Sequence, residues 1–369
     1  MIIKELRMYY VVMRLKEPFT TSFGTERFRH TLIIRLVDDK GMNGWGEVVA
    51  DSGPWYSYET VKTAWHIIRD YIAPQILGKD IDLRTFRDVA GKIRGHNMAK
   101  AGVEFALWDL MAKRKGMPLY KLLGGVRDKV PIGISIGIKR NVNELLKHIS
   151  KALDKGYLRI KIKIKPGWDV NIVKKVREEF GDIPLQVDAN SAYTLNDLPI
   201  LKELDKYDLL MIEQPLHYDD LVEHAELQRL LKTPICLDES IKGLRDTIAA
   251  YKLGSCSIIN VKPGRVGGLL ETLEIHEFTR KVGIPIWIGG LIETGIGRSF
   301  AIATATLLNV RYPNDISPSS RFWVKDLVEP PWELKSDGTI EVPKKPGIGV
   351  EVLEDVLVRY RRKELRLRP

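Results

Sequence analysis

Five charged residues recur along the chain at a nearly constant spacing. Lys163, Asp188, Glu213 and Asp238 follow one another at intervals of 25 residues, and Lys262 lies 24 residues further on. Each stands at the end of a short apolar stretch, and the spacing equals one unit of strand and helix. Because parallel strands of such units end at the same rim, we expect the five side chains to meet there.

Three of these residues predict a metal site. Asp188, Glu213 and Asp238 would repel one another and raise one another's pKa values unless a cation lay between them. Ligation by oxygen alone selects Mg²⁺, with Mn²⁺ or Co²⁺ in its place. A single acid after a strand would be read as a helix cap. Three acidic residues at the same position in successive units favour a metal site.

The two outer lysines predict proton transfer on a small carboxylate substrate. Lys163 and Lys262 belong to the second and sixth expected strands, which lie half a circumference apart in a barrel of eight. One could remove the proton beside a carboxylate, and the other could return a proton to the opposite face. We expect burial and nearby cations to lower a lysine pKa from about 10.4 towards about 7–8. Lys161 and Arg265 are the cations in position to do this.

The elements that must hold these residues alternate between strand and helix from Pro131 onwards. The stretch RIKIKIKP, residues 159–166, has period two, which by itself indicates an edge strand with its lysines in solvent. Eight strand candidates, of which NDIS at 314–317 is the weakest, instead predict an α/β fold with a (β/α)8-type barrel. In a barrel the isoleucines would face the helices and the lysines the interior. The preceding segment is expected to be α+β.

Composition limits the classes of protein that are compatible with the chain. It has 369 residues, of which 44% are hydrophobic, enough for a sizeable core. We expect no membrane span and a cytoplasmic location, because no apolar run approaches about 20 residues and the start has no cleavage signal. Two cysteines exclude a disulfide scaffold. The net charge of +10 leaves a non-enzymatic nucleic-acid-binding protein as a distant alternative. That alternative leaves the phased residues unexplained, so we expect no nucleic acid partner.

The phased residues resemble the enolase superfamily, in its muconate lactonizing enzyme subgroup. The motifs KIKIKPGWD, VDANSAYT, IEQPL, LDESI, NVKPGRVGG, GGLIETGIGR and NDISPSSRFW are very similar to the o-succinylbenzoate synthase and N-acylamino acid racemase family. The resemblance implies an N-terminal α+β capping domain at 1–125, a catalytic barrel at 126–324 and a C-terminal segment at 325–369 that returns to the capping domain. It also implies a homo-oligomer.

The resemblance assigns roles to residues around the site. It implies Lys163 and Lys262 as the acid and base, Lys161 as their electrostatic helper, and Asp188, Glu213 and Asp238 as metal ligands. The residues expected to contact and support these side chains are Asn190, Glu239, Arg265 and Glu293. Substrate contacts are expected from Phe19, Ser22, Phe23, Ser135, Gly290 and Ile292. The glycine-rich stretch around the last two opens a helix, whose free N–H groups could hold an anion or acyl oxygen.

Departures from related families leave two activities open. The stretch WIGGLIET lacks the histidine of mandelate racemases, and Asp315-Ile316-Ser317 lacks the paired aspartates of dipeptide epimerases. One remaining activity is racemisation of N-acyl or N-succinyl amino acids by both lysines. The other is o-succinylbenzoate synthesis, a syn dehydration in menaquinone biosynthesis for which Lys163 alone could suffice. Arg265 near Lys262 favours the racemase, and one protein can have both activities.

Overall fold

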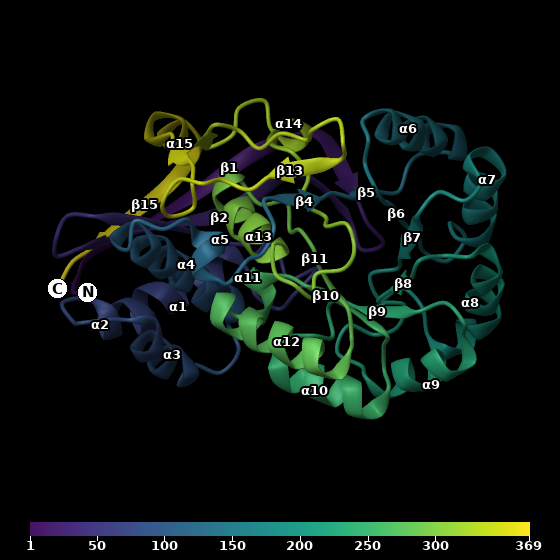
Figure 1. Cartoon of the computed structure of the whole chain (residues 1–369), viewed down its shortest axis with the longest axis horizontal. Coiled ribbons are helices and arrows are strands. Elements are labelled where there is room, and N and C mark those ends of the chain that lie inside the picture. Colours follow the sequence, from purple (N-terminus) through teal and green to yellow (C-terminus); the bar gives the residue numbers. More distant parts are fainter.

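A four-stranded antiparallel sheet forms one side of the molecule, at the left in Figure 1. The computed structural model describes all residues, 1–369. β1 (Ile3–Thr20) pairs with β2 (Thr25–Asp38), and β2 pairs with β3 (Asn43–Val48). The helical elements that follow are α1 (Val61–Ile67), the π-helical turn η1 (Ile68–Ile72), α2 (Ala73–Ile76), α3 (Leu83–Gly91), α4 (Asn97–Arg114) and α5 (Leu119–Leu122).

Helix α4 packs tightly on β3 because glycines leave room for its backbone. A side chain at Gly46 on β3 would overlap the carbonyl oxygen of Gly102 on α4. Thirteen of the α4 residues are buried, including the acidic Glu104 and Asp109. This buried helix lies between the sheet and the rest of the molecule.

Seven parallel strands form the second sheet, in the order β11-β10-β9-β8-β7-β6-β5. They are β5 (Ile134–Ile136), β6 (Ile160–Lys163), β7 (Leu185–Asp188), β8 (Ile212–Glu213), β9 (Ile235–Leu237), β10 (Ile258–Val261) and β11 (Ile286–Ile288). The intervening helices lie outside the sheet (Figure 1). These are α6 (Val142–Asp154), α7 (Val170–Phe180), α8 (Leu198–Leu204) between the 3-10 turns η2 (Leu195–Asp197) and η3 (Asp205–Tyr207), α9 (Val222–Leu230), α10 (Leu244–Leu253), α11 (Pro263–Val266), α12 (Leu269–Val282) and α13 (Gly295–Ala305).

The segment after α13 closes the barrel without forming a regular strand. The Arg311 N–H donates to the Ile286 carbonyl at 2.9 Å, on the β11 side. On the β5 side, the Asn314 N–H donates to the Pro131 carbonyl and the Gly133 N–H to the Asn314 carbonyl, both at 2.9 Å. The predicted fold class is therefore confirmed, with a bridging segment in the place of the expected eighth strand.

Both faces of β6 are buried, as a barrel requires. Ile160 and Ile162 are fully buried in the main hydrophobic core, while Arg159, Lys161 and Lys163 are at most 7% exposed. The edge-strand interpretation of this stretch is therefore wrong. Its alternation separates a helix-facing side from a polar barrel interior.

The last part of the chain crosses from the barrel to the first sheet. Its elements are α14 (Ser319–Phe322), β12 (Val328–Glu329), β13 (Thr339–Glu341), β14 (Glu351–Val352), α15 (Glu354–Tyr360) and β15 (Arg361–Leu367). β12 pairs with β14, β13 pairs with β4 (Lys129–Pro131), and β15 pairs with β1. The domain boundaries at 125 and 324 stay predictions.

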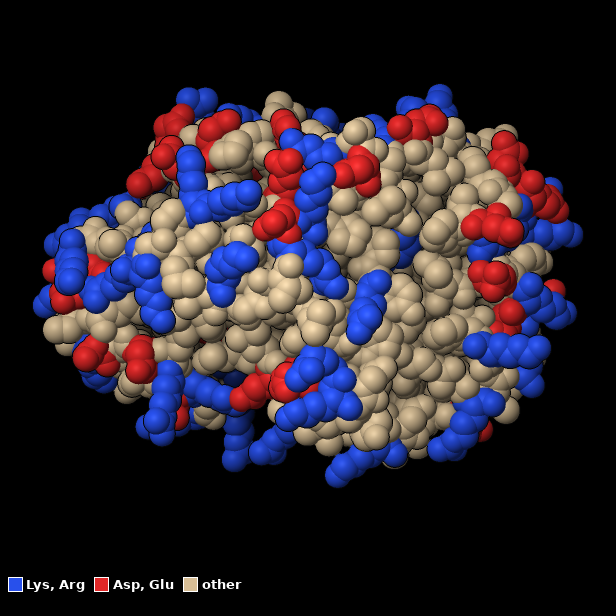
Figure 2. Space-filling view, viewed as in Figure 1, with Lys and Arg blue, Asp and Glu red and all other residues tan.

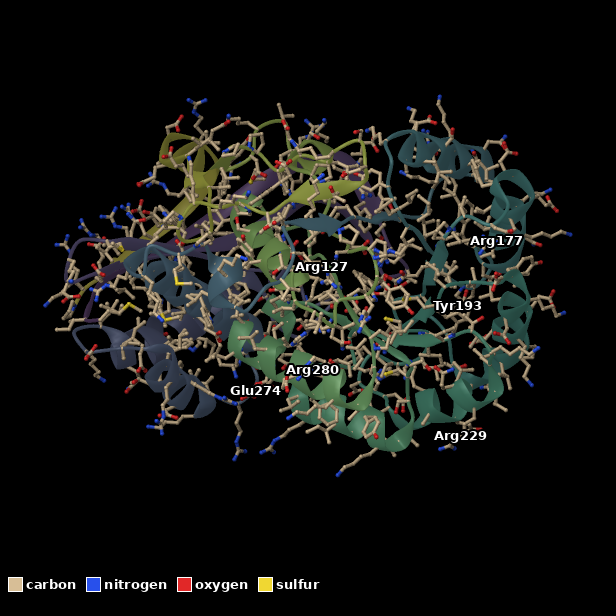
Figure 3. All side chains as sticks on the ribbon, in the orientation of Figure 1. Arg127, Arg177, Tyr193, Arg229, Glu274 and Arg280 are labelled. Carbon is tan, nitrogen blue, oxygen red and sulfur yellow. The ribbon has the colours of Figure 1, made fainter.

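Two arginines outside the barrel donate hydrogen bonds to backbone carbonyls in the loops that connect its strands and helices. Arg127 donates to the Leu308 carbonyl at 3.2 Å, just after α13, and Arg177 on α7 donates to the carbonyls of Tyr207 and Ile183, each at 2.8 Å (Figure 3). Lys and Arg alternate with acidic side chains over the face drawn in Figure 2. No helix combines the length and the apolar character needed to cross a membrane. The cytoplasmic location and the oligomeric state stay predictions.

Candidate active site

Three of the phased residues are aligned because their strands pair in register. Lys163 on β6 is opposite Asp188 on β7, and Asp188 is opposite Glu213 on β8. Asp238 and Lys262 directly follow β9 and β10. All five side chains are buried. The structure thus brings these residues to one rim of the barrel.

Each of the two outer lysines contacts a different carboxylate. The Lys163 ammonium donates to Asp188 Oδ2 at 2.6 Å and to Asn190 Oδ1 at 2.5 Å. The Lys262 ammonium donates to Asp238 Oδ2 at 2.8 Å. Strands β7, β8 and β9 separate the two lysines in the sheet, so they approach the rim from opposite sides.

Lys161 lies deeper in the barrel, among three carboxylates. Its Nζ is 2.6 Å from Asp315, 2.9 Å from Glu213 and 3.2 Å from Asp188. The pKa of Lys161 is raised well above its ordinary value, because these carboxylates outweigh the effect of burial. Lys161 therefore stays charged beside Lys163.

A tyrosine from the capping segment joins the Lys262 side of the rim. The Tyr56 hydroxyl donates to Asp238 at 3.2 Å and accepts from Lys262 at 3.1 Å. Arg265 Nη1 forms an ion pair with the same aspartate and also donates to the Tyr56 hydroxyl, at 3.2 Å. The sequence analysis missed Tyr56, because nothing in its local sequence indicates a contact 182 residues away.

The carboxylates repel one another, as the sequence predicts. Burial, followed by the charge of Asp188, raises the pKa of Glu213 to about 7. Burial, followed by the charges of Asp238 and Asp188, raises the pKa of Glu239 to about 8. The pKa of Asp188 stays well below its usual range because Lys163 and Lys161 outweigh its burial.

The donor set at the rim fits a hard divalent cation. Asp188, Glu213 and Asp238 are buried and offer oxygen only, and the Oε2 atom of Glu239 is buried without a partner. As the side chains stand, no group of three acidic, histidine or cysteine residues is arranged to hold an ion. Their charge is balanced by the ammoniums of the lysines and by Arg265.

The expected lowering of the lysine pKa is wrong for Lys262. Burial lowers its pKa, and Arg265 acts in the same direction, but Asp238 and Tyr56 together raise the pKa above the ordinary value. The reason is the direct ion pair with Asp238, which the sequence pattern could not foresee. Lys262 is therefore charged in this arrangement.

A cavity of 300 Å³ opens onto both outer lysines. Four of the expected substrate contacts line it together with Lys163 and Lys262, namely Phe19, Phe23, Gly290 and Ile292. A smaller cavity of 70 Å³ beside it contains Ser135 and Glu293, and the Ser135 hydroxyl is buried there without a partner. Ser22 lines neither cavity, and its hydroxyl donates to the Asn190 carbonyl at 3.3 Å.

The start of α13 is not free to bind an anion. Glu47 on β3 accepts hydrogen bonds from the backbone N–H groups of Thr294 at 3.1 Å and Gly297 at 2.8 Å. Asp326 accepts from the N–H of Gly295 at 2.8 Å. The expectation of an anion on the free N–H groups at the start of this helix is therefore wrong, because carboxylates of the protein already satisfy them.

Backbone strain concentrates at the ends of the strands. Asn190, Gln214 and Ile292 have positive φ angles of 43°, 38° and 55°. Positive φ is rare for residues other than glycine, and most so for β-branched ones such as isoleucine. Strain of this kind clusters at functional sites, where the surrounding fold must maintain it.

Two family models match nearly the whole chain. The enolase C-terminal domain-like model matches residues 144–356, and the mandelate racemase / muconate lactonizing enzyme N-terminal domain matches residues 3–124. An o-succinylbenzoate synthase of Geobacillus kaustophilus is 49% identical over 96% of both chains. An N-succinylamino acid racemase of Amycolatopsis is 47% identical over 94% of both chains.

The solved structures agree with this assignment. An enolase superfamily member from Listeria innocua has a TM-score of 0.96 and 40% identity, over 100% of this chain and 99% of that one. The chain belongs to the enolase superfamily, in the family of o-succinylbenzoate synthases and N-succinylamino acid racemases. It is therefore an enzyme of a superfamily whose members use a divalent metal ion, and the non-enzymatic alternative is rejected.

Proposed function

We propose that the protein racemises N-acyl amino acids, with N-succinyl amino acids as its substrates, through two lysines. The observation that carries this proposal is that Lys163 and Lys262 line one cavity from opposite sides, each on its own carboxylate. A carbon held between them exposes one face to each ammonium or amine. Two-sided proton transfer at that carbon inverts its configuration.

The roles of the lysines follow from their surroundings. For one enantiomer, the neutral Lys163 amine takes the α-proton at Nζ while the Lys262 ammonium donates a proton to the other face; the roles reverse for the other enantiomer. Lys161 remains charged and lies next to Lys163 on the same face of β6. Tyr56 and Arg265 hold Asp238, and with it Lys262.

Asp188, Glu213 and Asp238 would hold the divalent cation, with Mg²⁺ as the expected ion. When bound, the ion supplies positive charge that stabilises the negative charge developing on the substrate carboxylate. Glu239 and Asn190, joined by a hydrogen bond of 2.8 Å, support this side of the site. Phe19 and Phe23 cover the cavity from the β1–β2 hairpin.

The second candidate is o-succinylbenzoate synthesis. It is supported by the 49% identity to a synthase, against 47% for the racemase. In that reaction Lys163 alone carries out the proton transfers, and Lys262 serves as a fixed cation. The raised pKa of Lys262 keeps it charged, which fits the role of a fixed cation.

Proton NMR in D₂O tests the proposal directly. N-succinyl-L-phenylalanine is incubated with enzyme and Mg²⁺, the α-proton signal is followed, and chirality is measured afterwards. We expect loss of the signal together with racemisation, and neither with the Lys163→Ala variant. Absence of exchange with several acyl amino acids and metals would reject the racemase and leave the dehydration as the leading function.

A further inference from the structure

A cavity of 270 Å³ lies where the capping segment meets the barrel. Helices α3 and α4 line one side of it, and α11 and α12 line the other (Figure 1). Neither of the outer lysines and none of the three expected metal ligands lines this space. Its volume is near the lower end of the range for small-molecule sites, about 300–1,000 Å³. We refer to it as the interface cavity.

Four charged side chains in the lining of the interface cavity form no ion pair. Two are cations, Lys100 on α4 and Lys242 just before α10, and two are acids, Glu104 on α4 and Glu271 on α12. Glu104 is only 4% exposed, and the other three are half-buried. Charges of both signs therefore surround this space without a counter-charge from the protein.

The fifth charged residue of the lining is already neutralised. Arg87 on α3 donates two hydrogen bonds to Glu274 on α12, at 2.5 Å and 2.8 Å. Figure 3 labels Glu274 on the side of α12 that faces α3. This ion pair joins the two sides of the interface cavity and leaves the other four charges unpaired.

Two of the unpaired charges lie one turn apart on the same helix. Lys100 and Glu104 have the spacing at which a lysine and a glutamate commonly pair on a helix. Instead, Lys100 Nζ donates to the Ile93 carbonyl at 3.3 Å. Both hydrogen bonds of Glu104, from the Trp108 indole and the Leu270 N–H, are accepted by Oε1. Glu104 Oε2 is thus available to a donor in the cavity.

The surroundings of these two groups disfavour their charged forms. Burial lowers the pKa of Lys100 and raises the pKa of Glu104 to about 7. A ligand that carries an ammonium and a carboxylate would supply both counter-charges, through charge-assisted hydrogen bonds. A ligand with a single charge would satisfy only one sign of the lining.

The rest of the lining is suited to a hydrocarbon group. Phe86, Ala90, Val266 and Leu270 contribute apolar surface, and Phe86 and Val266 are only 1% and 2% exposed. Apolar walls with a few fixed polar groups select a ligand of matching pattern. An α-amino acid with an apolar side chain has both opposite charges and the hydrocarbon.

We propose that the interface cavity binds a free α-amino acid with an apolar side chain. The ammonium of the ligand pairs with Glu104 and Glu271, and its carboxylate pairs with Lys100 and Lys242. The side chain contacts the apolar residues of α3, α11 and α12. This site is separate from the reaction chamber, and it does not depend on the proposed function.

Titration calorimetry with L-phenylalanine tests the proposal. We expect the Glu104→Gln and the Lys100→Met/Lys242→Met variants to bind it at least about tenfold more weakly than the wild type, because each removes charged partners of the ligand. Phenethylamine and 3-phenylpropionate, which carry one charge each, should bind the wild type at least about tenfold more weakly than L-phenylalanine. The matched control is Lys92→Met/Lys252→Met, which removes the same charge from exposed positions outside the cavity and should leave binding unchanged.

The Lys163→Ala variant distinguishes the interface cavity from the reaction chamber. It should bind L-phenylalanine as the wild type does. Loss of binding in this variant, with unchanged binding in Glu104→Gln, would place the amino acid in the reaction chamber and overturn the proposal. Absence of binding to the wild type, or equal binding of the single-charge analogues, would also reject it. Failure of the proposed racemisation would leave these measurements unaffected, because they require no turnover.

Discussion

Lys161 Nζ lies 2.6 Å from Asp315 Oδ2, across the interior of the barrel. Asp315 also forms an ion pair with Arg159, whose guanidinium lies 4.5 Å from the centre of the Trp287 ring. This aspartate is thus occupied by two cations of the protein, which leaves it unsuited to grip a substrate amine. Its role is to hold the charged Lys161 beside Lys163.

Replacing Asp315 should therefore damage the site and the fold together. In the Asp315→Asn variant two buried cations lose their carboxylate, which we expect to cost about 3 kcal/mol of unfolding free energy. We also expect kcat to fall at least about tenfold, because Lys161 loses its anchor. Urea unfolding and the exchange assay measure the two effects. The matched control is Asp337→Asn, an exposed acid paired with Lys129, and it should change neither. An Asp315 variant with wild-type stability would contradict this reading of the network.

Replacing either outer lysine should abolish racemisation, and the two variants should lose exchange with opposite enantiomers. We expect Lys163→Ala and Lys262→Ala each to reduce racemisation at least about 100-fold, because each removes one of two proton-transfer groups. Each variant should still exchange the α-proton of one enantiomer, and the two variants should retain opposite enantiomers. Separate NMR time courses with the L and D substrates measure this. Loss of exchange with both enantiomers in Lys163→Ala, and of neither in Lys262→Ala, would favour the one-lysine dehydration.

The chemistry of the rim could be predicted from the sequence because one residue per strand-and-helix unit carries it. A constant spacing from Lys163 to Glu213 requires only that each unit has similar length, and parallel pairing then aligns these side chains with Asp188 between them. Asp238 lies two residues beyond Cys236, the partner of Glu213, at the end of the next strand. No tertiary information is needed for that step. The same reasoning gave the buried isoleucine face of β6.

The contacts that cross between segments could not be predicted in this way. Glu47 accepts a hydrogen bond from the N–H of Thr294, the N-cap residue of α13, which lies 247 residues further along the chain. Tyr56 reaches Asp238 from the capping segment. Such pairs have no periodicity in the sequence. Glu47 occupies N–H groups at the start of α13, and Asp238 and Tyr56 raise the pKa of Lys262. The expectations of free N–H groups there and of a lowered lysine pKa were wrong for this reason.

Divalent metal should stabilise the protein as well as activate it. A ligand at 100 times its dissociation constant adds about 2.7 kcal/mol to the unfolding free energy, so Mg²⁺, Mn²⁺ or Co²⁺ should raise the thermal midpoint of chelator-treated protein. Glu213→Gln and Asp188→Asn should abolish the rise. Glu226→Gln, at an exposed position on α9, should keep it. Scanning calorimetry with and without metal measures this, and an unchanged rise in both ligand variants would place the ion elsewhere.

A buried glutamate at the contact between α4 and α12 should make stability depend on pH. Glu104 Oε1 accepts from the Trp108 indole at 2.8 Å and from the N–H of Leu270 at 2.9 Å, in the first turn of α12. Burial raises the pKa of Glu104 from 4.5 to about 7. Between these values the unfolded chain loses the proton while the folded protein keeps it. The free energy of unfolding therefore falls as pH rises from about 4.5 to 7 and is flat above.

The Glu104→Gln variant should remove this pH dependence. The glutamine carbonyl can accept both hydrogen bonds, so the variant should match the wild type near pH 4.5. A pKa difference of about 2.5 corresponds to about 3 kcal/mol, so the variant should become more stable than the wild type by up to that amount above pH 7. Urea unfolding at several pH values measures the gap, with the exposed Glu223→Gln as control. A constant gap across this range would mean that Glu104 ionises in the folded protein as readily as in the unfolded chain.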